Sequence, residues 1–440
     1  MLYSSSKHSG ASGDDSPGGS DNPRGVDSDG RMEVVRGLCS FGRRLTGTDA
    51  ERRAANWLAG RLREQGRRAE VEPIHVHPQY GLVHAVHCVV GFGGSLLAVA
   101  SPAAGFALVL LAATSMYLDL NGRVYLIRSL FFRRASQNVV SPGRRPDAPA
   151  RLVLCAHYDA ARTGAAFAPR WARLAARLAR RMPVPVGPFR VLFWSLALLL
   201  PLLGARLAGV EPTAIGIAQL PPTIILLVGA FALVDIELSP VVPGANDNAS
   251  GVATVLALGA ELDREAPEAL DVWVLLTGGG ECLQEGMRAY LRAHRRDLDR
   301  DRTVFLSVET VGRGDVRFET SAGWVVSYDL DRRLVELAEA VARADRDAGD
   351  RYRAQPLARG VAGDSLPPRL RRHRSLGIGC SGEGGYVPDL HLPTDVPERV
   401  DPGALDRAHG FALELVRALS RDVARRAATK AASAASQANR

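Results

Sequence analysis

The chain has very little lysine and no clustered cysteine. Lysine occurs only at Lys7 and Lys430, so the formal net charge of +8 rests on arginine. The five cysteines are widely spaced and form no CxxC pair, a pattern typical of reduced thiols in the cytosol. No nucleic-acid motif is present, and the arginines do not alternate with aromatic residues. We therefore expect no nucleic-acid partner.

Charge is also nearly absent from two long apolar stretches, residues 83–120 and 191–234. A helix needs about 20 apolar residues to span a bilayer. Each stretch is interrupted near its middle, by SPAAG at 101–105 and by GVEPT at 209–213. The lengths predict two transmembrane hairpins and a lipid bilayer as partner. The alternative is a pair of buried helical hairpins in a soluble protein, which the long uncharged runs disfavour.

The arginines that flank these stretches predict their orientation. Six lie between residues 123 and 145, after the first stretch, and six lie between 170 and 190, before the second. The SPAAG segment carries no charge. Because positive residues stay on the cytoplasmic side, both hairpins are expected to enter from the cytoplasm and return to it. This topology describes an integral protein of the cell membrane whose globular domain faces the cytoplasm.

The remaining sequence is organised as one domain between two tails. Residues 1–30 are rich in serine, glycine and aspartate and are expected to be disordered, and residues 421–440 form a basic, alanine-rich, weakly helical tail. Residues 31–420 form the domain that the hairpins interrupt. Within it, Thr48 and Glu51 fit a capping box, which predicts a helix that ends at Gly66.

Side chains that can bind metals follow several apolar runs that read as buried strands. The ends of parallel strands share one edge of a sheet, where ligands bind. Taken singly, each of these histidines and carboxylates fits a core, surface or capping role, whereas together they are the ligand types that zinc prefers. A carboxylate shared by two ions would make a two-metal hydrolytic site. The segments are RLVLCAHYD (His157, Asp159), VPGANDNASG (Asp247), LDVWVLLTGGGE (Glu281), RTVFLSVETVG (Glu309) and LGIGCSGEGGYVPDLHLPTD (His391).

These segments resemble the co-catalytic zinc aminopeptidases, whose relatives include bacterial leucyl aminopeptidases and glutamate carboxypeptidases. GANDNASGVA is similar to the family's bridging-aspartate loop, AHYD to its His-x-Asp strand end and HLPTD to its His-Thr-Pro-x-Asp loop. The resemblance covers about residues 33–80, 135–160 and 240–420. It implies an α/β fold with a mostly parallel central sheet flanked by helices, into which the two hairpins are inserted.

The resemblance also implies a role for each ligand of two zinc ions. His157 and Glu309 would bind one ion, Glu281 and His391 the other, and Asp247 would bridge them. Asp159 would hydrogen-bond His157 and fix its tautomer. The family has aspartate where this chain has Glu309, so the geometry there would be shifted.

A larger departure lies in the stretch TGGGECLQEG, residues 277–286. The family has a Glu-Glu pair in which the first glutamate is the general base and the second is a ligand. An alignment on Gly286 and Tyr290 places Gly280 at the base position and Glu281 at the ligand position. A general base contributes about 10²–10⁴-fold to the rate. If Gly280 leaves the base position open, Gly280→Glu should raise hydrolysis.

Three readings of the missing base remain. Glu285 or Asp364 supplies the base, or Glu281 is itself the base and one zinc loses a ligand, or the domain keeps its metal site without peptidase activity. The preferred function is a membrane-embedded, zinc-dependent metallopeptidase of the aminopeptidase type that acts on peptides. The alternative is a catalytically impaired pseudopeptidase that binds peptides or membrane partners. A transporter would need more polar residues inside the spans. The sequence makes no prediction of oligomeric state.

Overall fold

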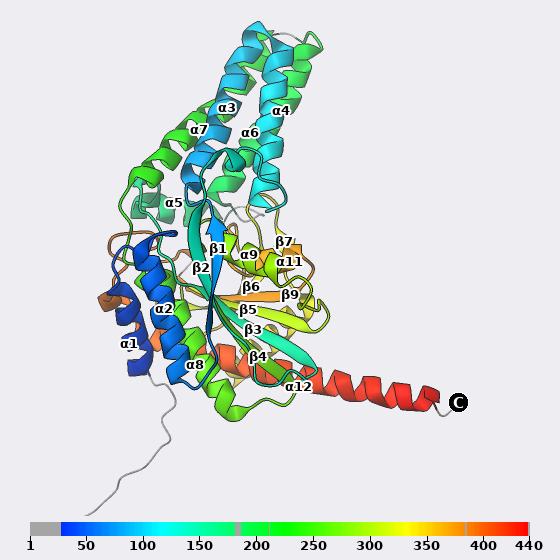
Figure 1. Ribbon diagram of the computed structural model, residues 1–440. Coiled ribbons are helices and arrows are strands. Elements are labelled where there is room, and N and C mark those ends of the chain that lie inside the picture. Colours follow the sequence, from blue (N-terminus) through cyan, green and yellow to red (C-terminus); the bar gives the residue numbers. More distant parts are fainter. Residues whose placement is uncertain (1–27, 180, 182–185, 211, 383–384, 439–440) are drawn as a thin grey trace, which may run out of the picture.

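The structure is a computed structural model that describes residues 28–179, 181, 186–210, 212–382 and 385–438 (Figure 1). The expected disorder of residues 1–30 falls almost wholly outside these ranges. Residues 28–30 open the first helix instead. The strands are β1 (Glu70–Val76), β2 (Arg134–Ser141), β3 (Ala150–His157), β4 (Leu270–Thr277), β5 (Thr303–Glu309), β6 (Asp315–Ala322), β7 (Tyr328–Asp329), β8 (Gln355–Ala358) and β9 (Arg374–Ser381).

The nine strands form one mixed sheet in the order β1-β2-β4-β3-β5-β9-β6-β7, with β8 paired to β6. The four central strands, β4, β3, β5 and β9, are parallel. The pairs β1–β2, β2–β4, β6–β9 and β6–β7 are antiparallel, whereas β8 pairs parallel with β6. The predicted α/β fold is thus confirmed, with parallel strands at the centre of the sheet and antiparallel pairs on both sides of them. Consequently β3, β4 and β5 end at the same edge.

Helices cover both faces of this sheet, and they include the helix that the Thr48 capping box predicted. Thr48 caps α2 by accepting a hydrogen bond from the Glu51 backbone nitrogen at 3.3 Å. The helices are α1 (Ser28–Cys39), α2 (Asp49–Glu64), α3 (Tyr80–Ala100), α4 (Pro102–Leu120), α5 (Pro169–Ala179), α6 (Pro188–Leu207), α7 (Pro212–Leu238), α8 (Ser250–Glu265), α9 (Glu285–Ala293), α10 (Arg332–Asp347), α11 (Leu366–Leu370) and α12 (Pro402–Ala438).

Alternate residues of the central strands enter two different cores. On β3, Leu152 and Leu154 pack in a large core with residues of α1, α2, α8 and α12. Val153 and Cys155 pack on the opposite face with residues of α9. A parallel strand buried on both faces is apolar along its whole length, which explains why RLVLCA reads as a continuous apolar run.

The two apolar stretches form four helices, α3, α4, α6 and α7, that stand together on one side of the sheet domain (Figure 1). Each is long and apolar enough to cross a membrane. The breaks lie at Ser101 and between Leu207 and Pro212, close to the predicted interruptions. Apolar side chains stay exposed on their outer surface, among them Val99, Ile217 and Phe231. A contiguous apolar surface of this kind suits contact with lipid.

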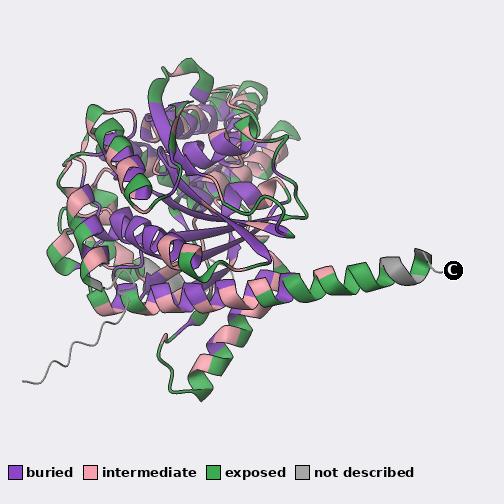
Figure 2. Cartoon of the chain, turned by 60° about the horizontal axis from the view of Figure 1, so that its bottom comes forward, coloured by how far each residue is buried: buried purple, intermediate pink, exposed green. Residues whose placement is uncertain are grey.

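The C-terminal helix α12 extends further than the sequence indicated. Its first half packs on the sheet, and its second half projects from the domain with mostly exposed residues (Figure 2). Residues 421–438, which were expected to form a weakly helical tail, continue this helix. Alanine favours the helix strongly, and Asp422 accepts hydrogen bonds from Arg333 on α10 and Arg425.

Candidate metal centre

Asp247 lies at the centre of the candidate site, in the loop that precedes α8. The carboxylate of Asp395 holds this loop by accepting hydrogen bonds from the backbone nitrogens of Asn246 at 2.6 Å and Asp247 at 3.1 Å. The side chain of Asn248 ties the same loop to the end of β5, because its amide nitrogen donates to the Val308 carbonyl at 3.1 Å. The Asp247 side chain is therefore fixed by buried bonds from two neighbouring segments.

The two oxygens of Asp247 face two different histidines. Oδ1 lies 3.4 Å from Nε2 of His157, and Oδ2 lies 3.1 Å from Nε2 of His391. His157 is the last residue of β3, whereas His391 comes from the loop after β9. This two-sided arrangement is the one that a bridging carboxylate needs.

Glu281 completes the group on the His391 side. Its Oε2 lies 3.4 Å from His391 Nε2, and single ligand atoms of His157, Asp247 and Glu281 all lie within 4.8 Å of one another. The other carboxylate oxygen, Oε1, is buried and accepts no hydrogen bond from any residue that the structure describes. A buried anionic oxygen without a partner is costly unless a cation binds it.

Glu309, the remaining predicted ligand, has other partners. Its Oε1 accepts a hydrogen bond from the Asp364 backbone nitrogen at 2.6 Å, and its Oε2 lies 3.4 Å from Nη1 of Arg359. Arg359 is held in turn by Glu319 at 2.6 Å. A metal ion bound by Glu309 would therefore compete with the guanidinium of Arg359. The assignment of Glu309 as a ligand stays a prediction.

Asp159 lies beside His157 and is also bonded to a second segment of the site. Its Oδ1 lies 3.4 Å from Nδ1 of His157. Its two oxygens also accept hydrogen bonds from the backbone nitrogens of Gly280 at 2.9 Å and Glu281 at 3.1 Å, and from the Thr46 hydroxyl at 2.6 Å. One buried carboxylate thus joins the end of β3 to the loop that carries Glu281.

Of the two candidate bases, Asp364 has the more suitable environment. Burial and the neighbouring Glu309 raise the pKa of Asp364 to about 7. Its Oδ2 accepts a hydrogen bond from Thr277 at 2.7 Å, whereas no residue that the structure describes bonds its buried Oδ1. A carboxyl group that titrates near neutral pH and keeps one oxygen open has the properties of a general base.

Glu285, the other candidate base, binds groups outside the metal cluster. These contacts argue against its predicted role as the general base. Its oxygens accept hydrogen bonds from the His77 backbone nitrogen at 2.6 Å and from Nη1 of Arg128 at 3.0 Å. Although burial raises it, these contacts lower the pKa of Glu285 overall. The sequence could not reveal this, because Arg128 precedes Glu285 by 157 residues.

Gly280 does not leave an open position beside the site. A methyl group added there would overlap the Cβ of His157 and would lie 2.5 Å from its Cγ. The imidazole of His157 fills the space into which a side chain at 280 would point. This steric contact argues against the expectation that Gly280→Glu restores a base.

The buried acids and histidines of the cluster shift one another's pKa values. Burial raises the pKa of Glu281 to about 8. Although burial lowers it, Glu281 and Asp247 raise the pKa of His391 to about 9. Although burial opposes it, bonds to His157 and His391 lower the pKa of the Asp247 carboxyl. Two imidazoles together with carboxylates are a donor set that fits zinc.

Sequence reasoning missed two supporting residues. Asp395 was within reach because it ends the quoted HLPTD motif. Arg44 had no such signal: it is fully buried, and its guanidinium donates to the carbonyls of Tyr158 at 3.0 Å and Gly244 at 3.1 Å. Arg44 therefore connects the residue after β3 to the Asp247 loop through hydrogen bonds.

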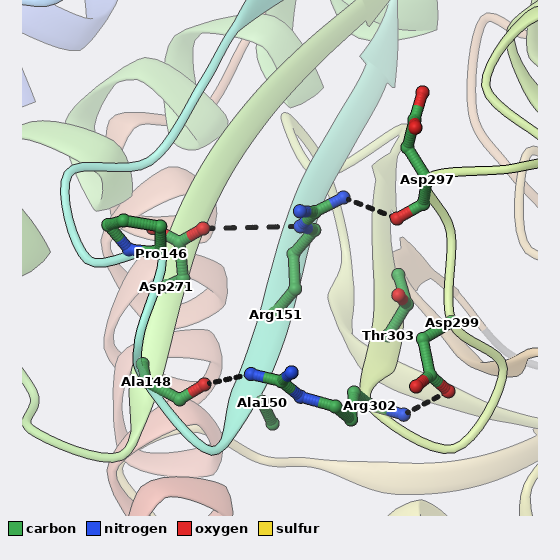
Figure 3. A pocket seen from close by; sticks show the side chains of 9 residues that line it. All are labelled: Pro146, Ala148, Ala150, Arg151, Asp271, Asp297, Asp299, Arg302 and Thr303. Atoms are coloured by element: carbon green, nitrogen blue, oxygen red, sulfur yellow. Dashed lines mark hydrogen bonds and ion pairs between the residues drawn. The ribbon is translucent and has the colours of Figure 1, made fainter.

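A surface hollow at the other edge of the sheet is separate from this cluster (Figure 3). It lies at the beginnings of β3, β4 and β5, whereas His157 and Glu309 lie at the ends of β3 and β5. Its arginines bond backbone carbonyls of the same hollow, since Arg151 donates to Asp297 at 3.2 Å and Arg302 donates to Ala148 at 2.7 Å. We assign no function to it.

Comparison with known proteins finds a family model that matches the part of the chain around this site. Residues 234–416 match Peptidase family M28. The M28 match contains Asp247, Glu281, Glu309 and His391, whereas His157 precedes it. The resemblance to zinc peptidases is thereby confirmed, and zinc is the metal that it implies. No curated protein sequence matches the chain.

Several solved structures share the fold of the M28-like domain. They include glutaminyl cyclase from Bacteroides thetaiotaomicron bound to N-acetylhistamine, with 15% identity, a TM-score of 0.52 and coverage of 90% of this chain and 98% of that chain. An Acidobacteriales bacterium glutaminyl cyclase has 14% identity, a TM-score of 0.51 and coverage of 93% and 100%. A leucine aminopeptidase precursor from Bacteroides thetaiotaomicron has 14% identity, a TM-score of 0.50 and coverage of 90% and 98%. At these identities the similarity establishes the fold alone.

Proposed function

We propose that the protein is a membrane-embedded, zinc-dependent metallopeptidase of the aminopeptidase type that hydrolyses peptide bonds at a two-metal site. The observation that carries the proposal is the placement of His157 and His391 on opposite oxygens of Asp247. Glu281 adds a ligand on the His391 side, and Glu309 is the expected third ligand on the His157 side. Bound zinc would supply Lewis-acid polarisation of the peptide carbonyl and activation of a water molecule.

The protein's own residues position the ligands and transfer the proton. Asp159 orients His157 and holds the backbone before Glu281, and Asp395 and Arg44 hold the Asp247 loop. Asp364 takes the role of general base, because its pKa of about 7 lets it accept a proton at neutral pH and later return it to the leaving amine.

The same proposal places the four apolar helices in the cell membrane and the peptidase domain in the cytoplasm. Ala103 lies at the uncharged tip of the first hairpin, and Asp147 lies on the arginine-rich side; both are exposed. In a background without Cys39, Asp147→Cys should react with a membrane-impermeant thiol reagent only after cell lysis. Ala103→Cys should react from outside or stay protected within the bilayer. Labelling of Asp147→Cys in intact cells would refute this orientation.

The second candidate function is a pseudopeptidase that binds peptides or membrane partners through the same metal site. It is favoured by one observation: the position of the family's base is a glycine, and its side-chain space is filled by His157. In this case the protein would bind zinc and peptide without cleaving the peptide.

One experiment separates the candidates. Purified protein in lipid nanodiscs is loaded with zinc or treated with a chelator, and hydrolysis of an aminoacyl reporter is measured with peptide binding. The peptidase proposal requires hydrolysis that chelation abolishes and zinc restores. Binding without hydrolysis identifies the pseudopeptidase. A peptide with an N-terminal glutamine, assayed in parallel, distinguishes hydrolysis from the cyclisation named for two of the similar structures.

A further inference from the structure

The loop that carries Glu281 rests directly on the four-helix membrane bundle. Leu283, two residues after Glu281, is buried in the apolar cluster formed by α3, α4, α6 and α7. Leu283 and Gln284 both have positive φ angles, of 61° and 58°. Residues other than glycine rarely adopt this backbone conformation unless surrounding contacts stabilise it. The bundle therefore contributes to the shape of the loop.

A chain of buried charges joins the same loop to the end of the first hairpin. Asp119, in the last turn of α4, binds Arg128 through both oxygens, at 2.8 Å to Nε and 2.7 Å to Nη2. The remaining terminal nitrogen of Arg128, Nη1, donates to Glu285 Oε1 at 3.0 Å. Glu285 is the first residue of α9 and lies four residues after Glu281. All three side chains are at least 96% buried.

A second arginine links the same two elements. Arg288, one turn along α9 from Glu285, donates to the carbonyl oxygens of Asp119 at 3.1 Å and Leu120 at 2.8 Å. These are carbonyls in the last turn of α4, which have no partner within the helix itself. Helix α9 is thus bonded to the end of α4 through both side chains and backbone.

Such a network resists partial displacement. Separation of one partner from a buried ion pair leaves an uncompensated charge, so displacement of one of these groups without the others is costly. Helix α4 has 19 residues, which corresponds to a length of about 28 Å, close to the hydrocarbon thickness of a bilayer. A bilayer of different thickness would shift or tilt the α3–α4 hairpin. The charges then transmit that shift to the loop before α9.

We propose that Arg128 is a positioning residue that couples the α3–α4 hairpin to the Glu281 loop, so that the thickness of the surrounding bilayer sets how firmly the site retains zinc. This inference rests on the proposed function for its metal assignment and for the placement of the four helices in the membrane. It gives the membrane helices a role in regulating the site besides anchorage. It also gives Glu285 a role, that of the carboxylate through which Arg128 holds the loop.

The test measures zinc release from purified protein in nanodiscs made with short-, medium- or long-chain phosphatidylcholine. Release to a chromophoric chelator is followed over time for the wild type, for Arg128→Gln and for Arg67→Gln. Arg67 is a matched control, because it is equally buried and paired with Asp263 at 2.7 Å but bonds the middle of β4 at the Val272 carbonyl. Glu285→Gln is a milder second variant, because an amide oxygen can still accept the bond from the His77 nitrogen.

The wild type and Arg67→Gln should release zinc at rates that change severalfold with lipid chain length. Arg128→Gln and Glu285→Gln should release it about 10–100-fold faster, the usual effect of losing a residue that orients a ligand, and with no dependence on chain length. If Arg128→Gln does not fold, Glu285→Gln decides the matter. The inference is overturned if the rate of zinc release from the wild type does not change with lipid chain length. It is also overturned if both variants release zinc at rates that depend on chain length as in the wild type.

The outcomes also separate this inference from the proposed function. A zinc-loaded wild type that responds to the bilayer but hydrolyses nothing removes the peptidase proposal and leaves the coupling intact. A wild type that hydrolyses peptides but releases zinc independently of the bilayer removes the coupling alone. A wild type that binds no zinc overturns both.

Discussion

The substitution Gly280→Ala tests the packing of the site most sharply. The added methyl group would overlap His157 Cβ and lie 2.5 Å from its Cγ and 3.0 Å from its Nδ1, whereas carbon atoms in contact normally lie about 3.5–4.0 Å apart. None of these atoms is the end of a flexible chain, because the imidazole is fixed between β3 and Asp247. We therefore expect either His157 or the Glu281 loop to move by about 1 Å.

Overpacking of this kind costs about 1–3 kcal/mol. The displaced imidazole should also weaken zinc binding by about 10–100-fold, as loss of ligand orientation does. Thermal unfolding and chelator competition measure the two effects. Gly60→Ala in α2 is the matched control, because no atom lies within 4 Å of the added methyl group. A glycine in a helix interior is worse than alanine by about 0.5–1 kcal/mol, so this control should be slightly stabilised.

If Gly280→Ala unfolds at the wild-type temperature and binds zinc as tightly, the space beside His157 is open and the reasoning fails. Gly280→Glu extends the test. The structure predicts that it loses zinc and gains no hydrolysis, whereas an open base position would let it gain activity.

Four further predictions concern the metal site and the base. Asp247→Ala should retain no zinc, since it removes the carboxylate shared by both histidines; elemental analysis of the purified variant would contradict this by finding two ions per chain. His391 has a pKa of about 9 when folded against about 6.5 when unfolded, so the stability of the metal-free protein should fall as pH rises from about 6.5 to 9. Zinc must displace that proton and the one on Glu281, so calorimetry at pH 7 in buffers of different ionisation enthalpy should register proton release, and its absence would refute the charge assignment. Asp364→Asn keeps an acceptor for Thr277 and should lower kcat by about 10²–10⁴-fold at unchanged zinc content, while an unchanged kcat would exclude Asp364 as the base.

The strands and the positions of the candidate ligands at their ends could be predicted because their signals are local. Apolar runs such as LDVWVLL mark buried strands, and GANDNASG places Asp247 before a helix. The edge that β3 and β5 share then follows from parallel pairing. Prediction fails where a side chain's role depends on a partner distant in sequence. From the sequence, Glu285 is a carboxylate close to the site and a candidate base. In the structure, its hydrogen bond from Arg128 gives it a different role.

Gly280 illustrates the same limit. Alignment identifies which residue replaces the family's glutamate, but only the position of His157 on the neighbouring strand shows that the space is filled. Glu309 is a comparable case, since Arg359, fifty residues later in the chain, takes one of its oxygens. Local sequence specifies the elements, and contacts between elements decide what their side chains can do.

The central claim is that zinc is held by His157, Asp247, Glu281 and His391. X-ray absorption at the zinc edge, recorded on purified protein in nanodiscs, tests it most directly. The account predicts nitrogen and oxygen ligands at about 2.0–2.2 Å with the scattering of imidazole rings, and loss of the zinc signal in Asp247→Ala. Sulfur ligands at about 2.3 Å, or an unchanged spectrum in that variant, would place the zinc elsewhere and contradict the account.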